Sequence, residues 1–172
     1  MKTLLKKEIK KLFKEFKQEY DFVLILENMQ YARNVAEIFR IADALKVKKV
    51  LLTGISQKPP FGKDLLKVSR SKESHVNWEY IQKSYNEIGK LKKQGYTVVA
   101  LEITDEALEI KNFKSNLKNN KIALVLGNEV YGVTKELLGY CDSSIFLPMY
   151  GRGASLNVSV SAGICLYLLS QN

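Results

Sequence analysis

Histidine and cysteine are nearly absent from this sequence. His75 is the single histidine, and the two cysteines, Cys141 and Cys165, lie far apart in the chain. Two isolated thiols build neither a disulfide framework nor a thiolate metal site. One histidine cannot form a zinc site that needs several histidines. Nor can it serve in a Ser-His-Asp triad and bind a metal elsewhere at the same time. We therefore expect no metal centre and two buried thiols without a chemical role.

Long apolar runs are absent as well. No stretch of about 18 apolar residues occurs, and the charged N-terminus does not resemble a signal peptide. Proline is scarce, at three residues, and apolar residues make up 46% of the 172 positions, which is enough to bury the core of one ordinary domain. We expect a soluble, cytoplasmic protein with no membrane segment and a single domain over residues 21–172.

Acidic residues are too few to balance the basic ones. The chain has 27 lysines and arginines against 18 aspartates and glutamates, which gives a formal charge of +9. This excess predicts a polyanionic partner such as nucleic acid, although a basic surface can also serve solubility alone.

Residues 1–20 carry a large share of that charge, with seven lysines against three glutamates. Apolar residues recur there at the spacing of an amphipathic helix, which must dock its apolar stripe on another surface. The lysines of this helix either form a solvated face or contact phosphates. The apolar stripe consists of Leu5, Ile9, Leu12, Phe13 and Phe16.

Strand-like and helix-like segments alternate through the rest of the chain. The predicted strands cover residues 22–26, 49–53, 96–101, 122–126 and 144–147, and the predicted helices cover 34–45, 80–94, 134–139 and 155–169. We expect Asn34 to begin the first of these helices, Ser155 to cap the last, and residues 102–120 to form a surface segment. The fold class is α/β, with a mainly parallel sheet flanked by helices.

Sheets of this kind bind ligands beyond the carboxyl ends of their strands, so we expect a site in the loops after residues 101, 126 and 147. The second loop contains Gly127, Glu129 and Gly132. These residues either contact a ligand or form a glycine-lined turn in which Glu129 faces a helix N-terminus. Neither a Gly-x-Gly-x-x-Gly fingerprint nor a P-loop lysine motif is present.

Three short motifs, in order along the chain, resemble those of a known family. The first extends from Asn34 to Arg40, the second covers residues 126–132, and the third joins residues 147–151 to residues 155–159. With this order and spacing, the chain resembles the SpoU (TrmH-like) branch of the SPOUT RNA methyltransferases over about residues 22–169.

The resemblance implies an enzyme that transfers a methyl group from S-adenosyl-L-methionine to a ribose 2'-hydroxyl of tRNA or rRNA. It also implies a homodimer and a C-terminal part threaded as a trefoil knot, a topology that general fold rules make nearly absent. The cofactor-binding residues that it implies are Leu101, Gly127, Leu147, Met149 and Leu156.

The resemblance further implies five catalytic residues: Asn34, Arg40, Glu129, Ser155 and Asn157. Arg40 is implied to activate the 2'-hydroxyl; otherwise it forms a surface salt bridge. A guanidinium is a poor proton acceptor, so we favour phosphate binding and stabilisation of the developing alkoxide, while a general-base role stays open. Side chains six residues apart on a helix point about 240° apart, so Arg40 and Asn34 share a site only if Asn34 lies in the first turn.

Two other functions remain open: a non-catalytic RNA-binding protein with this fold, and a SPOUT enzyme that methylates a base nitrogen. The presence of Arg40, Glu129, Ser155 and Asn157 argues against the first, and the Ser-Leu-Asn-Val-Ser motif at 155–159 argues against the second. Tyr150, Arg152 and residues 69–72 either contact RNA or form solvated loops. The absence of an additional RNA-binding domain favours tRNA over rRNA.

Overall fold

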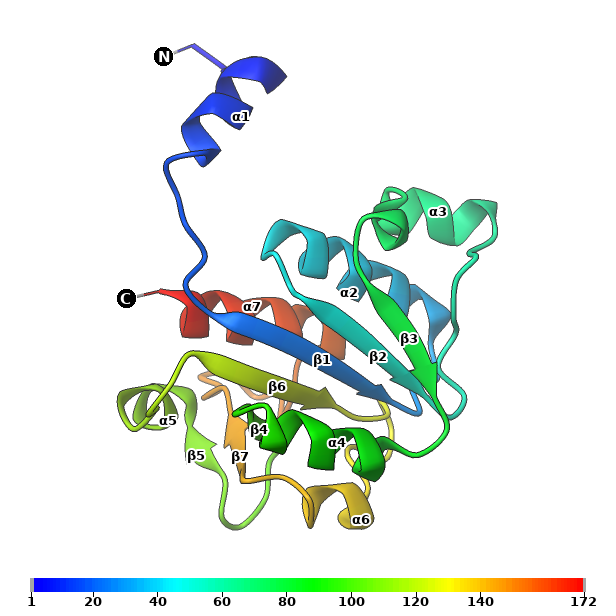
Figure 1. The fold of residues 1–172 in the computed structure, drawn as a ribbon, viewed down its shortest axis with the longest axis vertical. Coiled ribbons are helices and arrows are strands. Elements are labelled where there is room, and N and C mark those ends of the chain that lie inside the picture. The colour runs from blue at the N-terminus through cyan, green and yellow to red at the C-terminus, as the bar shows by residue number, and fades with distance from the viewer. Residues whose placement is uncertain (1, 172) are drawn as a thin grey trace.

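A sheet of seven strands forms the centre of the computed structural model, which describes residues 2–171 (Figure 1). The strands are β1 Asp21–Glu27, β2 Lys49–Thr53, β3 Trp78–Ile81, β4 Thr97–Leu101, β5 Leu108–Glu109, β6 Lys121–Leu126 and β7 Ser143–Phe146. Their order is β3-β2-β1-β6-β4-β7-β5, and every neighbouring pair is parallel. The predicted α/β class with a parallel sheet flanked by helices is confirmed.

Helices cover both faces of this sheet. The helices of the chain are α1 Lys6–Phe13, which does not pack on the sheet, α2 Ala32–Ala44, α3 Lys63–Ser69, α4 Ser84–Lys93, α5 Ile110–Ser115, α6 Lys135–Leu138 and α7 Val158–Ser170, with the short helix η1 Lys72–Ser74. Buried residues of α2, α5 and α7 pack on one face, and those of α4 and α6 pack on the other. Among residues 2–171, no helix has the length and apolar character needed to cross a membrane.

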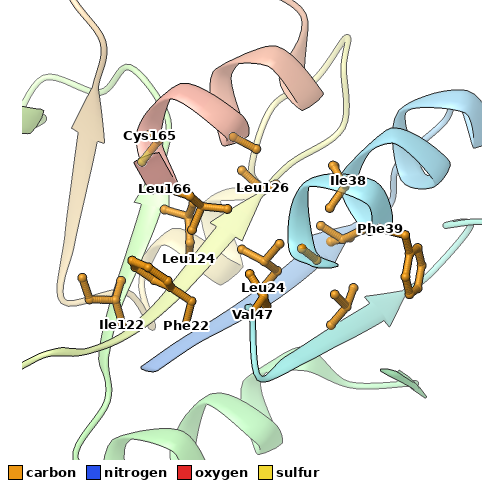
Figure 2. Packing of buried hydrophobic residues seen from close by; sticks show 14 of the residues in the cluster. Phe22, Leu24, Ile38, Phe39, Val47, Ile122, Leu124, Leu126, Cys165 and Leu166 are labelled. Carbon is orange, nitrogen blue, oxygen red and sulfur yellow. The ribbon is translucent and has the colours of Figure 1, made fainter. Parts of the chain in front are cut away.

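The central strands β1 and β6 are buried on both faces, which explains their uninterrupted apolar runs. Side chains alternate along β1, so that Phe22 and Leu24 face α2 and α7, whereas Val23 and Ile25 face α4 and α6. Figure 2 shows the first of these two clusters, where both helices and both strands contribute side chains, among them Phe22, Leu24, Ile38, Phe39, Leu124 and Leu166.

Three predicted helix starts are wrong. The helix predicted at 80–94 is α4, which begins at Ser84, because residues 80 and 81 belong to strand β3. Helix α2 begins at Ala32 and not at Asn34, which lies in its first turn and uses its side chain elsewhere. Helix α7 begins at Val158, and its cap is Asn157, not Ser155, because the Asn157 side chain accepts a hydrogen bond from Ser159 N at 2.8 Å.

The segment 102–120 is also more structured than predicted. It contains β5 and α5, and it buries Ile110 and Phe113 against the face that α2 and α7 cover. Helix α5 has only six residues, and two of them are apolar, which is too weak a periodic signal to predict a helix.

Helix α1 stands away from the rest of the chain (Figure 1). It is shorter than the predicted segment 1–20, and none of its residues is buried. The apolar stripe is exposed, from 36% at Ile9 to 73% at Phe16. The chain that follows is attached to the body where Gln18 Nε2 donates to Leu45 O at 3.1 Å.

Because every pair of strands is parallel, the loops after β4, β6 and β7 all begin at the same edge of the sheet. These three strands are neighbours in the order β6-β4-β7, so their loops meet. The threading of this region as a trefoil knot stays a prediction.

Candidate functional site

A cavity of about 360 Å³ opens where the loops after β4, β6 and β7 meet. These are the loops in which the sequence predicts a site. All the residues predicted to bind the cofactor line the cavity: Leu101, Gly127, Leu147, Met149 and Leu156. Of the predicted catalytic residues, four line it: Asn34, Glu129, Ser155 and Asn157.

The loop after β6 folds back so tightly that only glycine fits at Gly127. A Cβ atom there would lie 2.3 Å from the carbonyl carbon of Gly132 and from the backbone nitrogen of Val133. Two hydrogen bonds close the turn, from Asn128 N to Gly132 O at 3.0 Å and from Gly132 N to Asn128 O at 2.8 Å. The turn therefore places bare backbone at the cavity wall, where main-chain groups can contact a ligand.

Glu102 is a cavity residue that the prediction missed. It directly follows β4, and its Oε2 atom accepts a hydrogen bond from Val133 N at 2.9 Å. A Cβ atom at Gly132 would lie 2.3 Å from Oε2, so Glu102 would have to shift, and the φ of +70° at Gly132 also favours glycine. A carboxylate immediately after a buried strand was the signal that could have identified Glu102, by the same reasoning that identified Glu129.

Glu129 holds the start of α2 against the cavity. Its carboxylate accepts hydrogen bonds from the backbone nitrogens of Gln30 at 2.8 Å and Tyr31 at 3.2 Å, and from Asn34 Nδ2 at 2.6 Å. These donors lie 95 to 99 residues away in the chain. The helix start and the loop after β6 are thus fixed to one another by one side chain.

Asn157 extends this network to α7. Its Nδ2 donates to Asn34 Oδ1 at 2.9 Å, while its Oδ1 accepts from the backbone nitrogen and the hydroxyl of Ser159. The Ser159 hydroxyl is also 2.6 Å from Glu37 Oε2, and Glu37 in turn pairs with Arg33. The polar wall of the cavity is therefore a connected set of side chains with defined orientations.

Arg40 does not line the cavity of its own chain. It lies on α2, six residues beyond Asn34, with its side chain exposed. The rotation of about 240° between these positions sends the two side chains in different directions. Across residues 2–171, none of the ion pairs involves Arg40, so a surface salt bridge does not account for it either.

The two thiols lie outside the cavity. Burial raises the pKa of Cys165 to about 12, and burial is also the main cause that raises the pKa of Cys141 to about 12. Both groups are therefore protonated at neutral pH, where a thiol is a poor nucleophile.

The sequence matches the model of the SpoU rRNA Methylase family over residues 21–167. The chain belongs to this family. It is 32% identical over 168 residues to a tRNA (guanosine(18)-2'-O)-methyltransferase of Aquifex aeolicus, covering 95% of this chain and 76% of the relative. The tRNA (guanosine(18)-2'-O)-methyltransferase of Escherichia coli K12 is 27% identical over 155 residues, which cover 88% of this chain and 63% of the relative.

Solved structures agree with this SpoU assignment. The structure of a TrmH/SpoU tRNA-modifying enzyme from A. aeolicus has a TM-score of 0.76 at 27% identity, over 95% of this chain and 81% of that one. An AdoMet-bound rRNA methyltransferase from Sinorhizobium meliloti shares the fold, with a TM-score of 0.75 at 21% identity over 88% of this chain and 56% of that one. The predicted family and enzyme class, an S-adenosylmethionine-dependent RNA (ribose-2'-O)-methyltransferase, are confirmed.

Proposed function

We propose that this SpoU methylase modifies a ribose of tRNA, and that the cavity beside Glu129 and Asn157 is its active site. The hydrogen-bonded set of Glu129, Asn34 and Asn157 carries this proposal, because it orients polar groups at the wall of a cavity of the size that small molecules occupy. Relatives named for 2'-O-methylation of a tRNA guanosine support tRNA rather than rRNA as substrate.

S-Adenosylmethionine fits this cavity. Its lining combines the apolar residues Leu101, Leu147 and Leu156 with the bare backbone of the turn at Gly127. We assign the cofactor to these residues and Met149. When bound, it supplies an electrophilic methyl group on a sulfonium.

Methyl transfer to an oxygen is an in-line displacement, so the chain has to orient the ribose and lower the cost of removing the hydroxyl proton. Ser155 and Asn157, exposed at the cavity wall, are assigned to the ribose and its phosphate. Glu129 and Asn34 hold Asn157 in place. Solvent takes up the proton.

Arg40 is assigned to the phosphate and the developing alkoxide in the cavity of a partner subunit. This assignment follows from its position, since its side chain leaves α2 away from the cavity of its own chain. Arg40 directly precedes Ile41, which lines an apolar groove between α2 and α7. A second copy seated on this groove would bring its own Arg40 to the interface.

The composition of that groove supports a homodimer. Its lining is almost wholly carbon, and three of its large side chains are exposed: Ile164 at 39%, Tyr167 at 57% and Leu168 at 39%. Contiguous exposed apolar surface of this kind marks protein interfaces. The groove lies on the two helices whose first turns, at Asn34 and Val158, border the cavity. A dimer formed here therefore adjoins both active sites.

Residues 1–20 are assigned to a basic arm that is separate from the methyltransferase domain at 21–172. The exposure of every α1 residue and the seven lysines of this segment support contact with RNA phosphates. The enzyme is assigned to the cytoplasm, where tRNA is available.

The substrate is tested with purified tRNA and purified rRNA in separate reactions, each with a radiolabelled methyl donor. Label should enter the tRNA. Label confined to rRNA would overturn the proposed substrate while leaving the reaction unchanged.

A further inference from the structure

A second pocket lies at the same edge of the sheet, apart from the cavity described above. It is bordered by the carboxyl ends of β1, β2 and β3 and by the first turns of α4 and α6, and its volume is about 200 Å³. Residues from all these elements line it, including Glu27, Thr53, Gln82, Lys83, Tyr85 and Tyr140.

The path of the chain through the sheet favours ligand binding at this place. Strand β1 is followed by α2 on one face, whereas its neighbour β6 is followed by α6 on the other face. The two connections therefore diverge beside β1 and β6, and such crevices are where α/β sheets bind ligands. The methyl-donor cavity extends from here towards β4 and β7, and its lining includes Tyr31 and Asn34, so the second pocket shares this crevice with it.

Two carboxylates are among the polar groups of the pocket. The carboxylate of Glu27 is 6% exposed and accepts hydrogen bonds from Thr134 N at 2.9 Å and Thr134 Oγ1 at 2.7 Å. Each carboxylate oxygen has two lone pairs, so Glu27 can accept from a ligand as well. Glu136 adds a second carboxylate. Two carboxylates repel phosphate and suit a ligand with N–H donors.

Aromatic rings and lysines surround these acceptors. Tyr85 and Tyr140 are stacked with their ring centroids 5.7 Å apart, and Lys83 Nζ lies 5.8 Å from the centroid of Tyr85. Nearby, Lys58 Nζ lies 4.6 Å from the centroid of Tyr80. Proteins bind single-stranded RNA with aromatic rings, on which the bases stack, and with basic side chains, which contact the phosphate backbone of the RNA.

We propose that this pocket binds the base of a nucleotide near the methylated one. The base stacks on Tyr140, its amino or imino groups donate to Glu27 and Glu136, and Lys83 contacts the RNA backbone. The two sites adjoin, because Asn128 of the cavity donates to the backbone oxygen of Asn28 in the pocket at 2.8 Å. One RNA strand along this edge can therefore occupy both. This inference rests on the proposed methylation of tRNA.

Tyr140 gives the first test, because it is 43% exposed and can be shortened without opening the core. Tyr140→Ala should raise the KM for tRNA about tenfold through lost stacking, with little change in kcat or in the Kd for S-adenosylmethionine. Tyr140→Phe keeps the ring and should retain the KM of the unaltered enzyme. An unchanged KM in Tyr140→Ala, with its Tm preserved, would overturn the proposal.

Lys83 gives a matched pair with Lys93, which is exposed near the opposite end of α4. Lys83→Ala should raise the KM for tRNA and reduce its salt dependence by the equivalent of about one phosphate contact. Lys93→Ala should leave both unchanged. Equal effects of the two substitutions would contradict a specific role of the pocket.

Abasic RNA distinguishes stacking of a base from other effects of the same substitutions. Removing the base of one nucleotide near the target should weaken methylation by the unaltered enzyme and have no further effect on Tyr140→Ala. Additive losses at every position tested would overturn the pocket as a base site. A failure of the unaltered enzyme to methylate intact tRNA would contradict the proposed function. That result can be told apart from the two outcomes above, because both of them require activity on intact tRNA.

Discussion

Asn157 joins the fold to the site through a single side chain. Its oxygen caps α7 by accepting from Ser159, and its amide nitrogen donates to Asn34 at the cavity wall. Removal of the side chain therefore affects both the stability of the helix and the orientation of the site. These effects can be distinguished by a substitution that keeps the accepting oxygen but replaces the donating nitrogen.

Asn157→Asp is this substitution, because aspartate keeps the oxygen and lacks the amide nitrogen. A carboxylate can still cap α7, so the Tm should stay near that of the unaltered enzyme, whereas Asn157→Ala should lose about 1 kcal/mol of stability. Neither variant can donate to Asn34, so both should lose almost all turnover, a fall in kcat of about a hundredfold or more. The measurement is thermal unfolding together with single-turnover methylation. Full activity in Asn157→Asp would contradict the role of this hydrogen bond.

Cys165 gives a prediction that depends on pH. Burial raises the pKa of this thiol from its ordinary value of 9.0 to about 12, so alkylation by iodoacetamide at pH 8 should be far slower in the folded enzyme than in the denatured chain. The raised pKa means that the protonated thiol stabilises the fold at neutral pH, and that this contribution is lost as the pH rises from about 9 towards 12. Rapid alkylation of Cys165 at pH 8 would show that the site is accessible.

The wrong helix starts show what local sequence does not contain. Asn34 and Ser155 are both good capping residues by type. The start of α2 is instead fixed by Glu129, which is more than 90 residues away and accepts from Gln30, Tyr31 and Asn34. No local pattern reports a partner at that distance.

Among the elements, five of the seven strands were predictable, whereas the short, more exposed strands β3 and β5 and the order of the strands were not. The apolar runs of β1, β2, β4, β6 and β7 are each buried, and burial on both faces makes a strand easy to recognise. Their arrangement as β6-β4-β7 depends on packing between distant segments. The loops that form the cavity could still be predicted, because in a parallel sheet all carboxyl ends lie at one edge.

The arm is the element with the clearest deletion test. Removing residues 1–18 should leave the Tm of the body almost unchanged, since no residue of α1 is buried. The same deletion should weaken tRNA binding and flatten the dependence of log Kd on log salt concentration, because seven lysines are lost.

A matched variant separates charge from the apolar stripe of the arm. Replacement of Lys7, Lys10 and Lys14 by glutamine keeps the stripe and should reproduce part of the flattened salt dependence. An unchanged slope in both the deletion and the triple variant would mean that these lysines are only solvated.

At the scale of the whole molecule, the proposed role of Arg40 depends on the proposed homodimer. Arg40→Ala should abolish turnover while sparing cofactor binding, and so should Asn157→Asp. If Arg40 acts across the interface, a heterodimer of these two variants contains one intact active site.

Mixing the two inactive variants tests this arrangement. After subunit exchange, activity should return to at most roughly a quarter of the unaltered enzyme, because about half of the dimers are mixed and each has one working site. Each variant exchanged with itself is the control and should stay inactive. No recovery in a mixture shown to contain heterodimers would place Arg40 in the site of its own chain and contradict the proposed dimer.

The central claim is that the methyl group is placed on a ribose oxygen of tRNA. The most direct measurement is alkaline hydrolysis of tRNA that this enzyme has labelled with a tritiated methyl donor, since alkali cleaves RNA only beside a free 2'-hydroxyl. The label should appear in alkali-resistant dinucleotides that yield a 2'-O-methylated nucleoside. Label in mononucleotides with a methylated base, or no transfer to tRNA by enzyme that binds the cofactor, would contradict it.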